Sequence, residues 1–322
     1  GIFRGIRTSP QILDIAYTME ELCPDALMLN YTNPMSLLCH AVREMSDIQV
    51  LGLCHSVQGA HKEMARVIGE DPEECNSWIA GINHTAWVLE YTCRGQDAYP
   101  RIRQAALEDE EWYEGNTTRV EMLRHLGYYV TESSGHNSEY NWWFRKREDL
   151  IEKYQGEKFN GGTGFIKDIY PLEREEYIGK MREVAEQEEP YNLDRGHEYG
   201  SYIMNALESG EAFRFNPTVA NENLITNLPE GCSVEVPAYA DGAGVHPCHV
   251  GDLPPQLAAL NNAQVSSLTM ALEAAITGDR EMLYCSIAYD PLTAAKLSLA
   301  EIRSMVDELY EADKDLLPMF ED

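Results

Sequence analysis

The chain has 322 residues, of which 44% are hydrophobic, and a formal net charge of −29 at pH 7. This length and composition exclude a disordered or fibrous protein and allow one large core or two smaller ones. The acidic balance argues against nucleic acid or an anionic membrane as a partner, because such partners need a concentrated basic patch. No stretch reaches the ~18 consecutive apolar residues of a membrane span, and no signal segment stands at the front. We therefore expect a soluble cytoplasmic protein.

The first ninety residues are typical of an α/β fold. Residues 10–23 carry apolar side chains at helical spacing, and the segments 26–29 and 48–53 resemble short buried strands on either side of a helix over 34–45. A strand, a helix and a strand in this order form one β-α-β unit of a parallel sheet. The opening Gly-Ile-Phe-Arg-Gly is interpreted as a loop. No Gly-x-Gly-x-x-Gly turn follows an initial strand, so either nucleotide binding or its segment is absent here.

After Glu90 the pattern changes to a mixture of helices and extended segments. Helices rich in Glu, Arg and Leu are expected over about 99–126, 139–154 and 172–188. Extended segments follow over 213–224 and 232–250. The end of the chain, from 254 to 316, is predicted to be helical with one break at Asp290-Pro291.

The eight cysteines are scattered along the chain without a paired spacing. This distribution is unlike a secreted disulfide framework. A reducing compartment is therefore expected, in which Cys54 stays available as a thiolate.

Cys54 and His84 stand out as candidate metal ligands. Cys54 comes where the strand over 48–53 gives way to a helix that begins near Val57, and His84 ends the string Gly81-Ile82-Asn83-His84. Open α/β folds place their chemistry at such strand ends. A thiolate and an imidazole there can hold one divalent metal and leave positions for substrate oxygens. The alternative is structural, because buried cysteines are usually inert and this spacing is no recognised ligand signature.

Two other kinds of site have little support in the sequence. His246, Cys248 and His249 with Cys232 suggest zinc, but on an extended segment residues 246 and 248 face one way and 249 the other. No Gly-x-Ser-x-Gly string is present, so serine hydrolase chemistry has no support either.

Several strings carry more information together than any one of them does alone. They are Asn30-Tyr31-Thr32-Asn33-Pro34-Met35, Gly52-Leu53-Cys54-His55-Ser56-Val57-Gln58-Gly59, Gly81-Ile82-Asn83-His84, Val130-Thr131-Glu132-Ser133-Ser134, Glu139-Tyr140 with Trp143-Phe144, Asn227-Leu228-Pro229 with Val234-Glu235-Val236, and Asp290-Pro291. In this order and spacing they resemble glycoside hydrolase family 4, close to its α-galactosidase (melibiase-like) branch. The resemblance covers essentially the whole chain.

The resemblance implies an α/β fold in two domains. Residues 1–90 would be the C-terminal part of a Rossmann-like NAD-binding domain whose N-terminal part is missing in this chain. Residues 91–322 would form an α+β domain that closes the active site and supplies the interface of a homo-oligomer, a dimer or tetramer.

The implied reaction is hydrolysis of α-galactosides such as melibiose by redox elimination and addition. NAD+ takes a hydride from C3 of the sugar, and a divalent metal, typically Mn2+, polarises the new carbonyl. The C2 proton becomes acidic, the C1 substituent is eliminated, water adds and the hydride returns.

The resemblance also implies roles for individual residues. Cys54 and His84 match the metal ligands, and Asn33 matches a contact to a substrate hydroxyl and, with Asn30, to the cofactor. His55 is expected to donate a proton to the leaving group or to contact the sugar. Asn83 is expected to orient His84 or to touch the sugar.

The base that removes the C2 proton is expected in the middle of the chain. Tyr140 is the nearest counterpart, with His136 and Glu139 as competitors that would otherwise bind substrate. The alternative is that Tyr140 belongs to an aromatic packing face on a half-buried helix. Two further segments, Glu132–Ser134 and His197-Glu198, either line the sugar pocket or serve as a strand end and a surface cap.

Other functions remain open at this point. An α-glucosidase or α-galacturonidase would keep the mechanism, and a uronate would need a cation such as Arg4, Arg7 or Arg145. An NAD-dependent 2-hydroxyacid dehydrogenase shares the cofactor domain, but it would need no thiolate at Cys54. A third alternative is an inactive truncated fragment.

Overall fold

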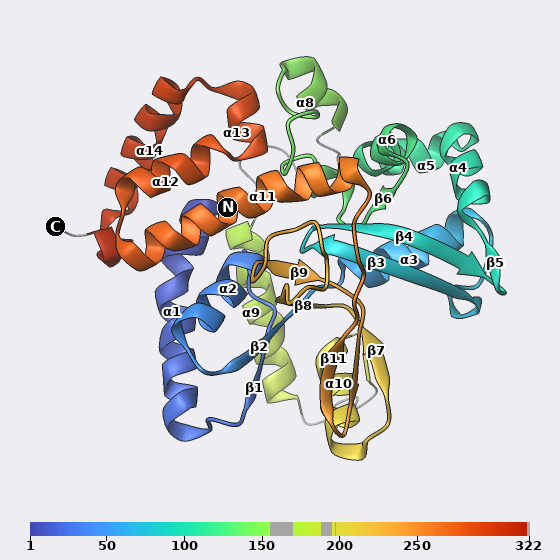
Figure 1. Ribbon diagram of the computed structural model, residues 1–322, viewed down its shortest axis with the longest axis horizontal. Coiled ribbons are helices and arrows are strands. Elements are labelled where there is room, and N and C mark those ends of the chain that lie inside the picture. The colour runs from blue at the N-terminus through green and yellow to red at the C-terminus, as the bar shows by residue number, and fades with distance from the viewer. Residues whose placement is uncertain (155–169, 188–194, 197, 321–322) are drawn as a thin grey trace.

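The computed structural model describes residues 1–154, 170–187, 195–196 and 198–320. Helices pack around a mixed eight-stranded sheet with the order β1-β2-β8-β9-β3-β4-β5, in which β6 pairs with β4 (Figure 1). A second, three-stranded sheet has the order β11-β10-β7.

The chain begins with the expected β-α-β unit. Its elements are α1 (Ile2–Leu22), β1 (Leu27–Asn30), α2 (Met35–Met45), β2 (Gln49–Leu53) and α3 (Ser56–Val67). β1 and β2 pair in parallel, which confirms the predicted unit. The interpretation of the opening residues as a loop is wrong, because α1 already starts at Ile2. Packing holds the start of this helix, since Ile6 is fully buried in a cluster with Ala274 and Leu283 of the C-terminal helices.

The next elements form an antiparallel hairpin. They are the 3-10 turn η1 (Pro72–Glu74), β3 (Cys75–Ile82), β4 (Thr85–Cys93) and β5 (Gln96–Asp97). Cys75 and Cys93 lie opposite each other in the β3–β4 pair and form a disulfide. The scattered cysteine spacing did not predict this bridge, because only the strand register brings the two residues together. The other six cysteines are free thiols.

The middle of the chain is largely helical. It contains α4 (Tyr99–Glu108), α5 (Glu110–Gly115), α6 (Thr117–Leu126), the short β6 (Tyr129–Val130), α7 (Ser134–Asn137), α8 (Glu148–Tyr154), α9 (Tyr170–Glu186) and α10 (Tyr199–Ser209). The predicted helix over 139–154 is wrong for residues 139–147, which are irregular. Side-chain hydrogen bonds hold this segment instead: Arg145 donates to Ser138 Oγ and to the carbonyl of Gly135, and Gln264 of α11 donates to the carbonyl of Tyr140.

The later strands join the two ends of the large sheet. They are β7 (Phe213–Phe215), β8 (Pro217–Ala220), β9 (Ser233–Glu235), β10 (Ala238–Asp241) and β11 (Gly244–Pro247), as the predicted extended segments require. β8 and β9 lie between β2 and β3, so residues before and after position 90 share one sheet. The division into two domains at residue 90 stays a prediction.

The chain ends in helices. These are α11 (Pro255–Thr277), α12 (Arg280–Ala288), α13 (Pro291–Lys296) and α14 (Leu299–Asp313), followed by the 3-10 turns η3 (Lys314–Leu316) and η4 (Pro318–Phe320). The predicted break at Asp290-Pro291 separates α12 from α13, but the prediction of a single break is wrong, because α11 also ends before Gly278 and α14 begins anew after Ser298. The long α11 runs past the hairpin end of β3 and β4 (Figure 1), where buried Asn261 accepts from the Trp87 indole at 2.9 Å and donates to the Thr85 carbonyl at 2.9 Å. None of the described helices is long and apolar enough to cross a membrane.

Candidate active site

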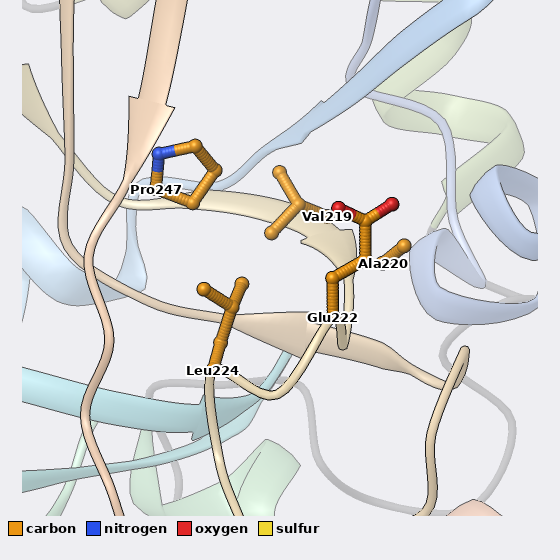
Figure 2. A pocket seen from close by; sticks show the side chains of 5 residues that line it. All are labelled: Val219, Ala220, Glu222, Leu224 and Pro247. Atoms are coloured by element: carbon orange, nitrogen blue, oxygen red, sulfur yellow. The ribbon is translucent and has the colours of Figure 1, made fainter.

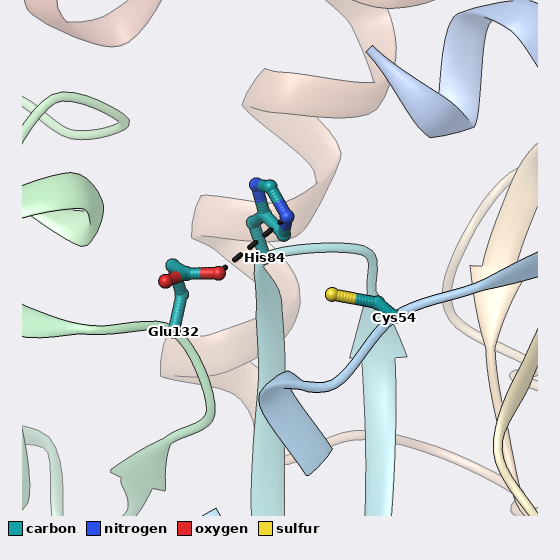
Figure 3. Close-up of side chains that lie close together, drawn as sticks. All are labelled: Cys54, His84 and Glu132. Carbon is teal, nitrogen blue, oxygen red and sulfur yellow. Dashed lines mark ion pairs between the residues drawn. The ribbon is translucent and has the colours of Figure 1, made fainter. Parts of the chain in front are cut away.

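Three metal-donor side chains from distant parts of the chain meet at one point (Figure 3). Cys54 follows β2, His84 lies in the loop between β3 and β4, and Glu132 follows β6. One ligand atom of each residue lies within 4.8 Å of those of the other two. Since zinc, for comparison, binds such donors at about 2.0–2.3 Å, a single divalent ion can contact all three.

The Glu132 carboxylate is oriented by its neighbour in the chain. Its Oε1 accepts from the backbone N of Ser133 at 2.7 Å and from Ser133 Oγ at 2.8 Å. Its Oε2 lies 3.4 Å from Nε2 of His84. Burial works to raise the pKa of Glu132, but the imidazoles of His84 and His136 and the bonds from Ser133 outweigh it, so the pKa is lowered. Glu132 therefore presents a charged oxygen to the other two donors, a role that sequence analysis did not predict.

His84 has an unusual backbone conformation that its surroundings support. It is the second residue of a two-residue hairpin loop and has a φ of 66°. Glycine is usual at such a position, and another residue costs about 1–3 kcal/mol. Asn137 Nδ2 donates to the His84 carbonyl at 3.1 Å and so helps to hold the turn. Burial lowers the pKa of His84, against the opposing effect of Glu132, so the imidazole is neutral at pH 7 and can bind a metal.

The ring nitrogen of His84 that faces away from Glu132 belongs to a hydrogen-bond network. Nδ1 of His84 lies 3.0 Å from the Tyr140 hydroxyl, which lies 2.6 Å from Nε2 of His136. Nδ1 of His136 lies 3.5 Å from Glu139. One consistent arrangement has His84 Nδ1–H donating to Tyr140, Tyr140 donating to His136, and His136 directed at Glu139. This leaves Nε2 of His84 free for an ion, with the other nitrogen oriented by a hydrogen bond, as metal-binding histidines usually are.

Tyr140 is therefore part of the site, in direct contact with a candidate ligand. Burial and then the negative charges of Glu132 and Glu139 raise its pKa far above the usual range, so it keeps its proton at neutral pH. The alternative of a plain aromatic packing face does not describe it, because its hydroxyl joins two imidazoles.

Asn30 and Asn33 shape the turn between β1 and α2. The Asn30 side chain accepts from the Thr32 backbone N and donates to the Thr32 carbonyl, both at 3.0 Å. Oδ1 of Asn33 accepts from the backbone N of Met35 at 3.2 Å, at the start of α2. Their contacts to sugar and cofactor stay predictions.

His55 lies on the exposed side of the donor cluster. It precedes the first residue of α3, and its Nε2 lies 2.8 Å from a carboxylate oxygen of Glu198. Its ring stacks on Tyr31, with ring centroids 5.9 Å apart. Glu198 was predicted to line the cavity or to cap the surface, and the structure places it against His55, the residue that follows Cys54 in the sequence. His197 lies outside the described residues.

Each of the three donors has, one or two positions away in the sequence, a residue with a buried polar atom that lacks a hydrogen-bond partner among the described residues. Ser56 Oγ, Asn83 Nδ2 and Thr131 Oγ1 are buried and have no hydrogen-bond partner within the described part of the chain. Buried polar atoms are normally paired, so an ion with its water or the hydroxyls of a sugar would satisfy Ser56 Oγ and Thr131 Oγ1, whereas Asn83 Nδ2 lies near the carboxyl of Glu235. The donor types and these atoms together fit a divalent metal with a polyhydroxyl ligand.

The remaining sequence candidates lie elsewhere. His246 is paired with Asp241 at 3.0 Å, and His249 contacts the carbonyl of Asn223. Within the described ranges, Cys54, His84 and Glu132 are the group found with metal-binding geometry, which gives the zinc interpretation no support.

A separate pocket of about 300 Å³ shares no residue with the donor cluster (Figure 2). It is lined by Val219, Ala220, Glu222, Leu224 and Pro247. These residues offer one carboxylate and no set of metal donors, so this pocket is not a candidate for metal-dependent catalysis.

Two family models together cover most of the chain. The model of family 4 glycosyl hydrolases matches residues 1–70, and the model of the C-terminal domain of family 4 glycosyl hydrolases matches residues 79–293. The chain belongs to glycosyl hydrolase family 4. The resemblance drawn from the sequence strings is confirmed.

Relatives of this family 4 protein carry specific names. It is 42% identical to an alpha-galactosidase of Bacillus subtilis (strain 168). The alignment spans 325 residues and covers 99% of this chain and 73% of the relative. It is 33% identical over 328 residues to an alpha-galactosidase of Rhizobium meliloti (strain 1021), which covers 99% of this chain and 66% of that relative.

A solved structure shows the same fold. A 6-phospho-alpha-glucosidase from gut microorganisms, in complex with NAD and Mn2+, superposes with a TM-score of 0.81 at 18% identity and covers 99% of this chain and 74% of that one. The predicted α/β fold is confirmed, and NAD and Mn2+, the cofactors that the resemblance implied, are bound together in that structure. A 2-hydroxyacid dehydrogenase is not supported, because family 4 glycosyl hydrolases are glycosidases.

Proposed function

We propose that this family 4 protein hydrolyses α-galactosides with NAD and Mn2+ as cofactors, by oxidation at C3, deprotonation at C2 and elimination at C1. The observation that carries the proposal is the convergence of Cys54, His84 and Glu132 at one point. The galactoside is favoured over other sugars because the two relatives described above, at 42% and 33% identity, are both named alpha-galactosidases.

The three donors would hold the metal. The Glu132 carboxylate is a donor that suits Mn2+, whereas the His84 imidazole and the Cys54 thiolate are softer donors, and the thiolate would add a second negative charge. When bound, NAD+ accepts the C3 hydride and the ion polarises the resulting ketone, which acidifies the C2–H bond. Each pKa unit removed from that carbon acid lowers the barrier by up to about 1.4 kcal/mol.

Tyr140 and His136 are the residues placed to move the C2 proton. The raised pKa of Tyr140 means that its hydroxyl must first pass its own proton on, and His136 Nε2 at 2.6 Å can accept it. Glu139 at 3.5 Å would stabilise the imidazolium that results. Tyr140 would then act as the base, and His136 and Glu139 would support it from behind.

His55 is the proposed proton donor to the leaving group. The Glu198 carboxylate lies 2.8 Å from Nε2 of His55 and orients the ring. Asn33 and Asn83 would contact sugar hydroxyls, and Asn30 with Asn33 would lie against the cofactor. These roles rest on the family strings and on the position of the residues around the donors.

A cytoplasmic location and assembly into a dimer or tetramer belong to the same proposal. Six of the eight cysteines are free thiols, which favours a reducing compartment, whereas the Cys75–Cys93 disulfide counts against it. Exposed apolar side chains on α9, namely Leu172, Tyr177, Ile178 and Met181, offer surface for a second copy. Light scattering on a gel-filtration column measures the assembly, and a monomer at all concentrations would refute it.

The activity is tested by release of nitrophenol from p-nitrophenyl α-galactoside, with and without NAD+, Mn2+ and a reducing agent. Turnover is expected only when all three are present. The Cys54→Ala variant is expected to lose metal-dependent turnover, whereas Cys285→Ala, which removes an exposed free thiol, should keep it. Activity that survives removal of both cofactors would exclude the redox mechanism.

The galacturonide is the second substrate to compare. Of the three arginines considered for a uronate, Arg7 pairs with Asp313 at 2.7 Å and Arg145 binds Ser138 at 2.7 Å. Arg4 remains, and it lies near enough to Tyr140 to act against the rise in its pKa. Faster turnover of the galacturonide, lost in Arg4→Gln, would replace the galactoside proposal.

A further inference from the structure

Glu235 is a fully buried carboxyl group in the middle of the large sheet. It ends β9 and has Thr218 of β8 on one side and Gly81 of β3 on the other. It is 0% exposed, and neither carboxyl oxygen has a hydrogen-bond partner within the described residues. Leaving such a group unpaired costs about 1–3 kcal/mol, so a structural role alone does not explain why the position holds glutamate.

The group nearest in chemistry to this carboxyl is the amide of Asn83. Asn83 lies two residues beyond Gly81, in the two-residue loop that follows β3, which places it diagonally from Glu235. Gly81 has no side chain, so nothing on β3 stands directly opposite Glu235. The Nδ2 atom of Asn83 is itself buried and unpaired. One unpaired hydrogen-bond donor, Asn83 Nδ2, and two unpaired acceptors, the Glu235 carboxyl oxygens, thus lie at neighbouring positions.

The electrostatics of Glu235 connect it with the donor cluster. Burial raises its pKa well above the usual range, the charge of Cys54 adds to the rise, and the Asn83 amide acts against it. The Asn83 amide therefore lies close enough to the carboxyl to act on it as a donor would, although no hydrogen bond joins the two side chains in the structure.

We propose that Glu235 is a positioning residue that holds the side-chain nitrogen of Asn83. This fixes which end of the Asn83 amide faces Glu235, so that Oδ1 is the end presented to a sugar hydroxyl. It also anchors the two-residue loop whose second residue, His84, has the left-handed φ of 66°. The inference rests on the proposed function, because it concerns the loop that carries a proposed metal ligand.

The test is a double-mutant cycle on Mn2+ affinity, measured by titration calorimetry or electron paramagnetic resonance without sugar. Glu235→Leu and Asn83→Ala are each expected to weaken Mn2+ binding by about 10-fold, as is usual for residues behind a ligand. The double variant should lose no more Mn2+ affinity than the single variant that binds Mn2+ less tightly, because the same interaction is removed in all three. Glu235→Gln keeps an acceptor oxygen and should bind within about 3-fold of the parent protein.

Controls separate this inference from the proposed function. Glu222→Gln removes an exposed carboxylate on the separate pocket of Figure 2 and should bind Mn2+ normally. Failure of the unmutated protein to bind Mn2+ would overturn the ligand set itself. Normal Mn2+ binding by Glu235→Leu, or losses that add in the double variant, would overturn the role of Glu235 alone.

A second readout covers the case in which Glu235→Leu does not fold. The imidazole nitrogen shifts of 15N-histidine-labelled protein, recorded without metal, report the environment of His84. Asn83→Ala is expected to shift the His84 signals and to leave those of His246, which lies on β11, unchanged. Unchanged His84 signals together with unchanged Mn2+ affinity in Asn83→Ala would refute the proposal.

Discussion

Tyr140→Phe separates a base that acts only in catalysis from a residue that also orients a metal ligand. The change removes one oxygen that lies 3.0 Å from His84 Nδ1 and 2.6 Å from His136 Nε2. Two buried hydrogen bonds are lost, each with a net value of about 0.5–1.5 kcal/mol. His136 Nε2 already lies 3.2 Å from His84 Nδ1 and can partly replace the hydroxyl.

The expected loss of Mn2+ affinity is therefore about 10-fold, at the lower end of the range for residues behind a ligand. A tenfold change equals about 1.4 kcal/mol, which agrees with the loss of one to two such bonds. Titration calorimetry on the sugar-free protein measures it. Tyr113→Phe is the matched control. It removes a hydroxyl that donates to Glu121 at 2.7 Å and that does not contact Cys54, His84 or Glu132.

Two results would refute this reasoning. Parent-like Mn2+ affinity in Tyr140→Phe would show that the hydroxyl does not orient His84. An equal loss in Tyr113→Phe would show that the effect is not local to the site.

Three further predictions concern stability. Asn261→Ala leaves the Trp87 indole N–H and the Thr85 carbonyl buried and unpaired, at about 1–3 kcal/mol each, so the free energy of unfolding should fall by about 2–6 kcal/mol in denaturant titrations. Burial lowers the pKa of His61, so the unfolded chain binds a proton at this residue more readily than the folded chain does. The free energy of unfolding should therefore fall as the pH drops below about 6.5, and this fall should be less steep in His61→Gln. Reduction of the disulfide between β3 and β4, which joins residues 18 apart, should cost about 3 kcal/mol, measured by unfolding with and without reductant.

Each of these has an outcome that contradicts it. Asn261→Ala within 0.5 kcal/mol of the parent, on the order of a surface substitution, would mean that the two groups find other partners. An unchanged pH slope in His61→Gln would assign the slope to other histidines. Equal stability with and without reductant would show that the bridge does not restrict the unfolded chain.

Local patterns predicted the parts of the fold that depend on neighbouring residues. The β-α-β unit follows from apolar spacing and from Pro34, and the break at Asp290-Pro291 follows from the missing proline N–H. The helix expected over 10–23 starts earlier, at Ile2, because Ile6 is buried against the C-terminal helices. The segment 139–147 looked helical by composition, but bonds from Arg145 and Gln264 hold it in another form.

The candidate site divides in the same way. Cys54 and His84 could be selected because glycines and apolar residues mark their strand ends. Glu132 could not be selected as a donor, since its approach depends on β6 pairing with β4 and on two bonds from Ser133. The pairing of Cys75 with Cys93 and the position of Glu235 likewise depend on strand register, which no local pattern records.

The proposed chemistry is tested most directly at C2 of the sugar. The protein is incubated with an α-galactoside, NAD+ and Mn2+ in D2O, and the released galactose is examined by proton NMR. Removal and return of the C2 proton predicts deuterium at C2 of the product, because the abstracted proton exchanges with solvent. Galactose released with its C2 proton intact would contradict the redox mechanism and leave the Cys54–His84–Glu132 cluster without its proposed role.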